Sequence, residues 1–222
     1  MIGCSWNPPQ YMIPSRLPFI PLEVEIDNLI AGCNGRKVST FLQILKETAM
    51  RSGEADKLKW TNVDFEARLV RITPEKGSKP RILKLSNKAL TMLNGLQRES
   101  NWVFGGSLYN IRRTFERQRK RLAVKLGNPR LDQITFHTLR HWKATMLYNQ
   151  TEDIYYVQRF LGHKSILNTM IYISLEEAHY HEGNEKFICK VTTTIKEAEP
   201  LIEAGFEYVC EIDGTRIFKK RK

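Results

Sequence analysis

Four side chains between residues 137 and 172 are of types that handle phosphate: His137, Arg140, His163 and Tyr172. His137 and Arg140 are three residues apart, so they face the same way if this segment is helical. Gly162 ends a helical pattern as a C-terminal cap does, which predicts His163 just past a helix end. Tyr172 then lies about two turns into the next helix. Together, these side chains predict a site that handles phosphate.

This stretch resembles the catalytic box of the tyrosine recombinases, the phage-integrase and Xer-like family, and looks closest to their archaeal members. The family pattern is Arg, Lys, His-x-x-Arg, His or Trp, and Tyr. All six positions occur here in order, as Arg51, Lys76, His137, Arg140, His163 and Tyr172. The resemblance covers residues 18 to 178, and as a set the six positions are highly specific.

The resemblance implies that Tyr172 attacks a DNA phosphate, forms a 3′-phosphotyrosine and releases a 5′ hydroxyl. Arg51, which fits the family pattern Thr-x-x-Arg-x-x-Glu, and Arg140 would stabilise the charge on the non-bridging oxygens. His163 would donate a hydrogen bond to the same phosphate. His137 would take the proton from Tyr172. Because arginines supply the charge stabilisation that Mg²⁺ supplies elsewhere, no metal and no cofactor are predicted.

A hairpin is predicted to carry the lysine of the set. Residues 67–73 and 81–85 are rich in β-branched residues or alternate in polarity, so they are expected to pair as strands. Lys76 lies in the loop between them, and the resemblance implies that it protonates the leaving 5′ oxygen. Lys79, in the same loop, is the competing candidate by position.

The rest of the chain is predicted to be mostly helical. Helices are expected at 21–31, 39–50, 86–98, 107–126, 137–149, 151–161, 165–173 and 174–181. A strand at 187–193, a helix at 195–204 and a hairpin of 206–212 with 215–219 follow.

The predicted fold class is therefore α+β: a mostly α-helical catalytic domain of the tyrosine-recombinase type with a small antiparallel β-sheet, plus a small C-terminal β-α-β-β appendage. The expected divisions are an irregular lead-in over 1–18, a catalytic domain over 19–181, and an extension with a basic tail over 182–222.

The charge balance favours a polyanionic partner. The 222 residues carry a net charge of +11, with a pI of about 9.6. This charge favours a protein that binds nucleic acid over a basic protein with no polyanionic partner. The basic run of helix 107–126 is nearly all of one sign, which is typical of a phosphate-tracking face. The residues predicted to contact double-stranded DNA are Lys79, Arg112, Arg113, Arg117, Lys120 and Lys143. From the resemblance, a homotetramer is expected on DNA, and a monomer could exist free in solution.

Other classes of protein are disfavoured. The four cysteines have no C-x-x-C spacing, so neither a zinc site nor a secreted disulfide framework is predicted. Cys189 and Cys210 could lie on paired strands, which leaves a disulfide open. No signal peptide and no membrane-spanning run are expected, which favours the cytoplasm. His137 and His141 have the spacing of a helical zinc pair, but Thr138 stands where the metalloprotease motif has Glu.

Two alternatives to an active recombinase stay open. One is a non-catalytic DNA-binding fragment of an interrupted integrase. The other is an enzyme like the type IB topoisomerases, with the same chemistry and no site specificity. Full-length relatives carry an N-terminal helical domain that clamps the opposite side of the DNA, and the residues before 18 leave no room for it. The expectation is a catalytic domain alone.

Overall fold

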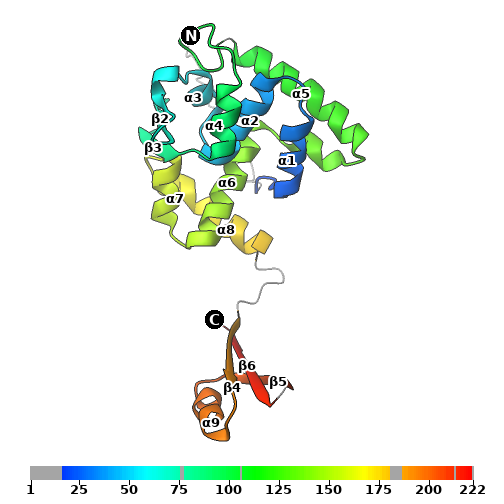
Figure 1. Ribbon diagram of the computed structural model, residues 1–222, viewed down its shortest axis with the longest axis vertical. Helices are drawn as coiled ribbons and strands as arrows, with labels where there is room; N and C mark the ends of the chain where they lie inside the picture. Colours follow the sequence, from blue (N-terminus) through cyan, green and yellow to red (C-terminus); the bar gives the residue numbers. More distant parts are fainter. Residues whose placement is uncertain (1–16, 76–77, 106, 181–186, 213, 222) are drawn as a thin grey trace, which may run out of the picture. The chain divides into compact units, whose positions relative to one another are not determined.

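The computed structural model describes residues 17–75, 78–105, 107–180, 187–212 and 214–221 (Figure 1). The contacts between its residues divide the chain into two compact units, Met1–Leu175 and Glu176–Lys222. Most of the predicted lead-in lies outside the described residues, and so does Lys76. No described helix is long and apolar enough to cross a membrane.

The first unit is built mainly of helices. They are α1 (Glu23–Gly32), α2 (Arg36–Thr48), α3 (Ser52–Asp56), α4 (Asn87–Asn94), α5 (Leu108–Lys125), α6 (Phe136–Thr151), α7 (Ile154–Leu161) and the first part of α8 (Leu167–Tyr180). Two short 3₁₀ segments lie at Trp60–Asn62 and Pro129–Gln133. This confirms the predicted mostly helical fold.

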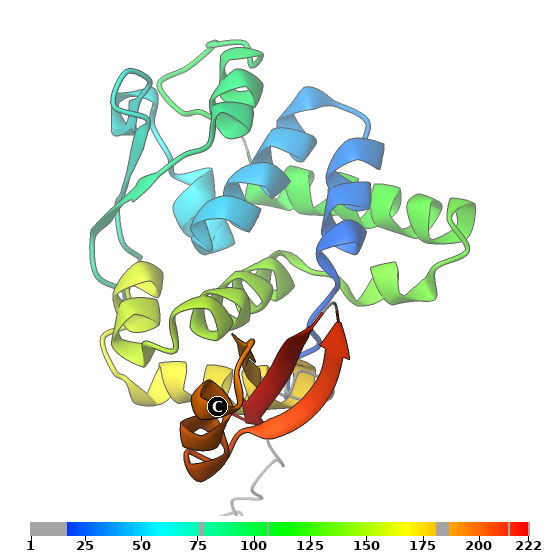
Figure 2. The ribbon, with the colours of Figure 1, turned by 60° about the horizontal axis from the view of Figure 1, so that its bottom comes forward.

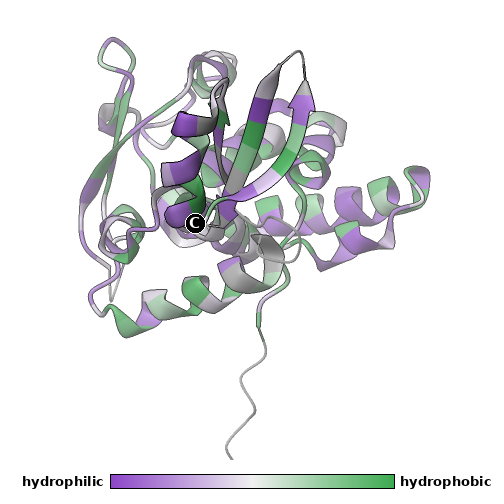
Figure 3. Ribbon diagram, turned by 90° about the horizontal axis from the view of Figure 1, so that it is seen from below, coloured by the Kyte–Doolittle hydropathy of each residue, from purple (hydrophilic) through white to green (hydrophobic). Residues whose placement is uncertain are grey.

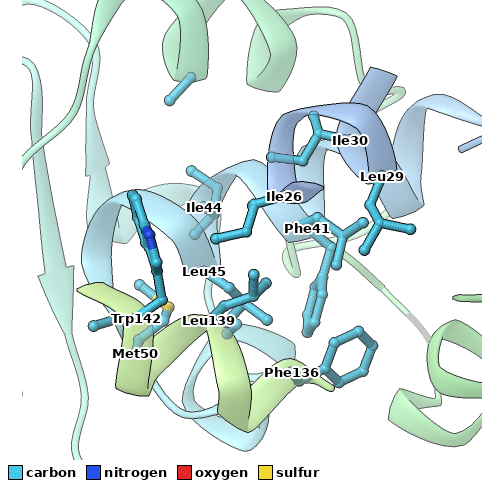
Figure 4. Close-up of a cluster of buried hydrophobic side chains, with 14 of the residues drawn as sticks. Ile26, Leu29, Ile30, Phe41, Ile44, Leu45, Met50, Phe136, Leu139 and Trp142 are labelled. Carbon is cyan, nitrogen blue, oxygen red and sulfur yellow. The ribbon is translucent and has the colours of Figure 1, made fainter. Parts of the chain in front are cut away.

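Helix α2 forms the centre of the core, and α1, α4, α5 and α6 pack against it. The labelled side chains in Figure 4 come from α1 (Ile26, Leu29, Ile30), from α2 and the turn after it (Phe41, Ile44, Leu45, Met50) and from α6 (Phe136, Leu139, Trp142). The Phe41 ring is fully buried, with its centroid 4.9 Å from that of Phe104 and 5.1 Å from that of Phe136. Truncating such a ring to alanine costs about 3–5 kcal/mol, so this contact fixes α2 against α6.

A three-stranded antiparallel sheet lies at one edge of this unit, beside α7 (Figure 2). Its strands are β1 (Val63–Asp64), β2 (Leu69–Ile72) and β3 (Arg81–Lys84), in the order β1-β2-β3. The β2–β3 hairpin confirms the predicted one, with Val70 opposite Leu83. The two-residue strand β1 was not predicted, because so short a segment shows no alternation.

The second unit confirms the predicted β-α-β-β order. It contains β4 (Phe187–Thr192), α9 (Ile195–Glu203), β5 (Glu207–Ile212) and β6 (Thr215–Arg221). The sheet order is β4-β6-β5, and Phe218 of β6 is buried with Ala198 and Leu201 of α9. The suggestion that Cys189 and Cys210 lie on paired strands is wrong, because β6 separates β4 from β5. Cys210 is a free thiol.

Two predicted helix boundaries are also corrected. The segment from 165 to 181, predicted as two short helices, contains one helix, α8, so Tyr172 lies inside a helix and not near its end. Thr151, at the start of the predicted helix 151–161, is the last residue of α6, and Asp153 caps α7 by accepting a hydrogen bond from the Tyr156 amide. The second error comes from the polar side chain of Thr151, a residue type that often caps helices.

Candidate active site

Helix α6 presents three side chains of the site from consecutive turns. Thr135 caps it and accepts a hydrogen bond from the Thr138 amide at 3.2 Å, which fixes where the helix begins. His137 then lies in the first turn, Arg140 in the second, and His141 one turn beyond His137. The pKa of His137 is lowered by desolvation and by the charges of Arg140 and Arg51, so its ring is neutral near pH 7.

The Arg140 side chain is 2% exposed and joins two segments that are distant in the sequence. Its guanidinium donates to the Ala49 carbonyl, at the end of α2, and to the Leu161 carbonyl, at the end of α7, the latter at 2.8 Å. Carbonyls at helix C-termini carry partial negative charge, which partly offsets the buried cation. Burial and the neighbouring Arg51 lower the pKa of Arg140 to about 10, so it stays protonated near pH 7.

Arg51 follows Ala49 by two residues and forms the N-cap of α3. Its amide donates to Glu54 at 2.9 Å, and its guanidinium donates to the Ser78 hydroxyl at 2.8 Å. Glu54 also binds Arg81 at 2.7 Å, and its pKa stays below the usual value, since these hydrogen bonds and charges outweigh desolvation. With 30% of its side chain exposed, Arg51 can reach a ligand in the site.

His163 follows the left-handed residue Gly162 (φ +68°) that ends α7, as the sequence predicted. The ring is 7% exposed, and its Nδ1 lies 2.9 Å from the Thr169 hydroxyl. When that hydroxyl donates, the neutral ring carries its proton on Nε2, which is then free to donate to a phosphate. Burial, Arg140 and Arg51 lower the pKa of His163 to about 4.

The hairpin loop is attached to this turn. The Lys79 amide donates to the Gly162 carbonyl at 2.8 Å, and the Ser78 hydroxyl reaches the same oxygen at 3.3 Å. Since Ser78 also accepts from Arg51, one side of the loop that carries Lys76 is tied to the first arginine and to the turn before His163.

Tyr172 lies in α8 and is 2% exposed. Its hydroxyl lies 3.3 Å from Nδ1 of His141, whose ring centroid is 4.5 Å from that of His137. Burial raises the pKa of Tyr172, and the charges of Arg140 and Arg51 partly counter this rise. The phenol is therefore protonated near pH 7 and needs a proton acceptor before it can act as a nucleophile.

These side chains line one pocket of about 380 Å³. Its lining residues are Arg51, His137, Arg140, His141, His163, Leu167, Asn168, Ile171 and Tyr172. Five of the six predicted residues thus come together, and the sixth, Lys76, is outside the described residues. His141 was not predicted as a member of the site. The signal was its position four residues after His137, which places both on one face of a helix.

The predicted DNA contacts fall in different places. Arg112 lines a second pocket, of about 400 Å³, that also contains His137. Arg113, Arg117 and Lys120 are exposed on α5, which is largely hydrophilic in Figure 3. In contrast, Lys79 and Lys143 line a separate cavity of about 1020 Å³.

That cavity is also lined by Glu23, Asp27 and Glu47, so Lys143 faces carboxylates there instead of the active-site pocket. Within the described parts of the chain, no three His, Cys, Asp or Glu side chains gather closely enough to hold a metal ion.

Comparison with known protein families agrees with this geometry. The model of the phage integrase family matches residues 23–179. The chain is 28% identical over 185 residues to the tyrosine recombinase XerA of Pyrococcus horikoshii, covering 78% of this chain and 63% of the relative. It is 28% identical over 177 residues to the tyrosine recombinase XerD of Yersinia pestis, and the match covers 72% of this chain and 58% of XerD. The relatives include an archaeal and a bacterial protein, so they do not single out the archaeal branch.

Solved structures show the same fold. A crystal structure of XerA recombinase superimposes with a TM-score of 0.60 at 25% identity, covering 77% of this chain and 67% of that one. The catalytic domain of bacteriophage HP1 integrase gives a TM-score of 0.55 at 25% identity, and the match covers 74% of this chain and 92% of that domain. Because the family model spans most of the chain and the expected side chains meet in one pocket, this protein belongs to the phage integrase family.

Proposed function

We propose that this chain is the catalytic part of a site-specific DNA recombinase that cleaves and rejoins strands through a 3′-phosphotyrosine. The observation that carries the proposal is the pocket itself. Arg51, His137, Arg140, His163 and Tyr172 come from four separate segments and line it together. The chain spans 63% and 58% of the XerA and XerD relatives, so the activity is proposed for the part of the protein described here.

The proposed reaction places the scissile phosphate between Tyr172 and the two arginines. Tyr172 Oη forms a bond to phosphorus, and the bond between phosphorus and the 5′ oxygen breaks. Arg51 and Arg140 stabilise the added charge on the non-bridging oxygens, because fixed guanidinium donors need no rearrangement as the charge develops. His163 donates from Nε2 to the same phosphate.

The leaving 5′ oxygen needs a proton, and we assign its donor to Lys76. The contacts of Ser78 and Lys79 with the Gly162 turn support this assignment, because they tie one side of the loop to the site. The retained 3′-phosphotyrosine conserves the energy of the phosphodiester bond. Rejoining is the reverse reaction with a new 5′ hydroxyl, and it needs no metal ion or nucleotide cofactor.

Double-stranded DNA is the proposed partner, bound by a homotetramer, with residues 19–181 as the catalytic domain and 182–222 as an extension. A solved relative at 26% identity, XerH recombinase, is described as bound to its difH substrate. In this chain, the exposed basic residues of α5 and the pocket shared by Arg112 and His137 support a path for the DNA backbone to the active site.

A covalent-trapping assay tests the proposal. Duplexes from a randomised pool, each with a sulfur in place of the bridging 5′ oxygen, are incubated with the protein in EDTA. A thiolate leaves without a proton donor and does not attack back, so any phosphotyrosine accumulates. We expect a denaturant-resistant complex with the wild type and none with Tyr172→Phe.

Absence of any complex, with DNA still retarded on a native gel, would support the binding-only alternative. Complexes of equal yield on all sequences, together with relaxation of any supercoiled plasmid, would support the topoisomerase-like alternative instead.

A further inference from the structure

The structure gives the nucleophile an unexpected hydrogen-bond partner. Tyr172 Oη lies 3.3 Å from His141 Nδ1, and the two ring centroids are 5.8 Å apart. His137, to which the family resemblance gives the role of base, has its ring packed edge-on against His141. It also lines the second pocket, beside Arg112. His137 is therefore placed between the basic helix α5 and the site, where a DNA phosphate would pass.

We propose that His141 is a catalytic residue that accepts the phenolic proton of Tyr172 during strand cleavage and returns it during rejoining. This inference deepens the proposed function and rests on it. In the cleavage step, the proton passes from Tyr172 Oη to His141 Nδ1 while Oη bonds to phosphorus. The bond between phosphorus and the 5′ oxygen breaks, and that oxygen takes a proton from the acid assigned above. His137 is left to contact the phosphate.

The geometry fixes the state in which His141 must act. Accepting from the Tyr172 hydroxyl requires a free lone pair on Nδ1, so the ring proton must be on Nε2. Burial, His137 and Arg140 lower the pKa of His141 to about 4, which keeps the ring neutral near pH 7. The other ionisable groups that line the pocket are Arg51, His163 and Tyr172.

A base with so low a pKa is weak in the free protein. The positive charge of the nearby arginines disfavours protonation of the His141 ring. A bound phosphate is an anion, so it would offset that positive charge. DNA binding should therefore raise the pKa of His141 and strengthen it as a base when the substrate is in place.

The test compares His141→Asn with His137→Asn on the phosphorothiolate duplexes described above. The asparagine side chain can place an amide group near the position of Nδ1 and keep a hydrogen bond to Tyr172, but it cannot take up the proton. The sulfur leaving group removes the need for an acid, so the measured rate reports proton removal from Tyr172. Rates of covalent complex formation are measured from about pH 6 to pH 8.5 at saturating protein.

We expect the wild-type rate to be nearly flat over this range. His141→Asn should be slower by about 100-fold or more at pH 7, and its rate should rise about tenfold per pH unit, because hydroxide then removes the proton. His137→Asn should keep the flat profile, with a lower rate or weaker DNA binding.

Three results would overturn the inference: a wild-type rate with His141→Asn, a slow rate that does not depend on pH, or the steep profile with His137→Asn instead. The second of these would make His141 a positioning residue only. His141→Gln serves as a second variant if the first has a lower melting temperature than the wild type. If the wild type itself forms no complex, the proposed function fails, and that outcome is distinct from all three.

Discussion

At Arg140, one guanidinium faces the pocket and also binds the backbone at the ends of two helices. Glu54, which is 3% exposed, likewise joins two segments, because it holds Arg81 and accepts a hydrogen bond from the Arg51 amide. Removing one partner of a buried ion pair leaves an uncompensated buried charge. This loss destabilises the fold more than replacing both partners with apolar residues does. The charged residues in and beside this pocket therefore also stabilise the fold.

Glu54→Gln tests this at the level of one residue. Because Arg81 would lose its buried carboxylate, we expect the free energy of unfolding to fall by about 3 kcal/mol, with weaker strand cleavage as Arg51 loses its anchor. Urea denaturation measures the first effect. The exposed Glu66→Gln is the control, expected within about 0.5 kcal/mol of wild type. Equal stability of the two variants would contradict the role given to the buried pair.

Two histidines with lowered pKa values, His141 and His163, should make the stability of the fold depend on pH. The folded pKa values of His141 and His163 are both about 4, below the ordinary value of 6.5, so the unfolded state binds more protons as the pH falls. The free energy of unfolding should therefore reach its highest value above about pH 6.5 and decrease towards pH 4, by about 1.6 kcal/mol per histidine between pH 6.5 and 5. Glu25 and Glu54, whose pKa values are lowered from 4.5, add little loss in that window.

Thermal unfolding from pH 7 to pH 5 measures this. His163→Asn should flatten the dependence by about half, since the asparagine does not titrate. A wild-type melting temperature that does not change over this window would show that neither ring is held neutral.

At the scale of elements, the Gly162 turn brings the hairpin and His163 together. A Cβ at this position would lie 2.8 Å from the Lys79 carbonyl oxygen, in addition to the strain of the left-handed backbone. We expect Gly162→Ala to lower the free energy of unfolding by about 2–3 kcal/mol and to slow cleavage more than tenfold, because the hairpin and His163 must move apart.

Gly127 provides a matched control. It has a similar backbone conformation (φ +59°), and a Cβ there would meet nothing within 4 Å. Gly127→Ala should cost only the strain, about 1 kcal/mol, with cleavage unchanged. Similar cleavage rates for the two variants would show that the contact between the hairpin and the turn does not affect the site.

The sequence alone predicted the elements whose signals are local. The Gly162 turn and the β2–β3 hairpin each depend on a few neighbouring residues, and the structure confirms them. The helix predicted at 137–149 is also present, as α6 from Phe136 to Thr151. The placement of the cysteine strands depends on long-range pairing through β6, which no local pattern encodes. His141 was missed because its partner Tyr172 is 31 residues away and no sequence spacing shows their contact.

At the scale of the whole molecule, the net positive charge is confined to one part of the chain. Residues 1–175 contain 27 basic and 14 acidic residues, whereas residues 176–222 contain 8 basic and 10 acidic residues. The first unit is therefore the one that a polyanion attracts, while the second is close to neutral. Long-range attraction to DNA should come from the unit that contains the active-site pocket.

Replacing Arg113, Arg117 and Lys120 of α5 together by alanine should weaken DNA binding on all sequences. If all three contact phosphates, the slope of log affinity against log salt concentration should fall by up to about 2.7, since each contact contributes about 0.9. Fluorescence anisotropy across a salt series measures this slope.

The control removes three basic residues of the second unit: Lys190, Lys196 and Arg216. This variant should keep the wild-type slope, because these charges lie among an excess of acidic residues. An equal loss of slope in both variants would show that DNA contacts extend over both units.

Helix α8 carries Tyr172 and continues past Leu175, where the first unit ends, to Tyr180 in the second. The eight helical steps from Tyr172 to Tyr180 span about 12 Å of hydrogen-bonded backbone, which is stiff to both stretching and twisting. A tensile load or a torque applied at the C-terminal end of α8 is therefore transmitted along the helix to Tyr172, the proposed nucleophile. Arg51 and Arg140 lie on α3 and α6, so such a load would move the Tyr172 hydroxyl relative to the two arginines proposed to bind the phosphate.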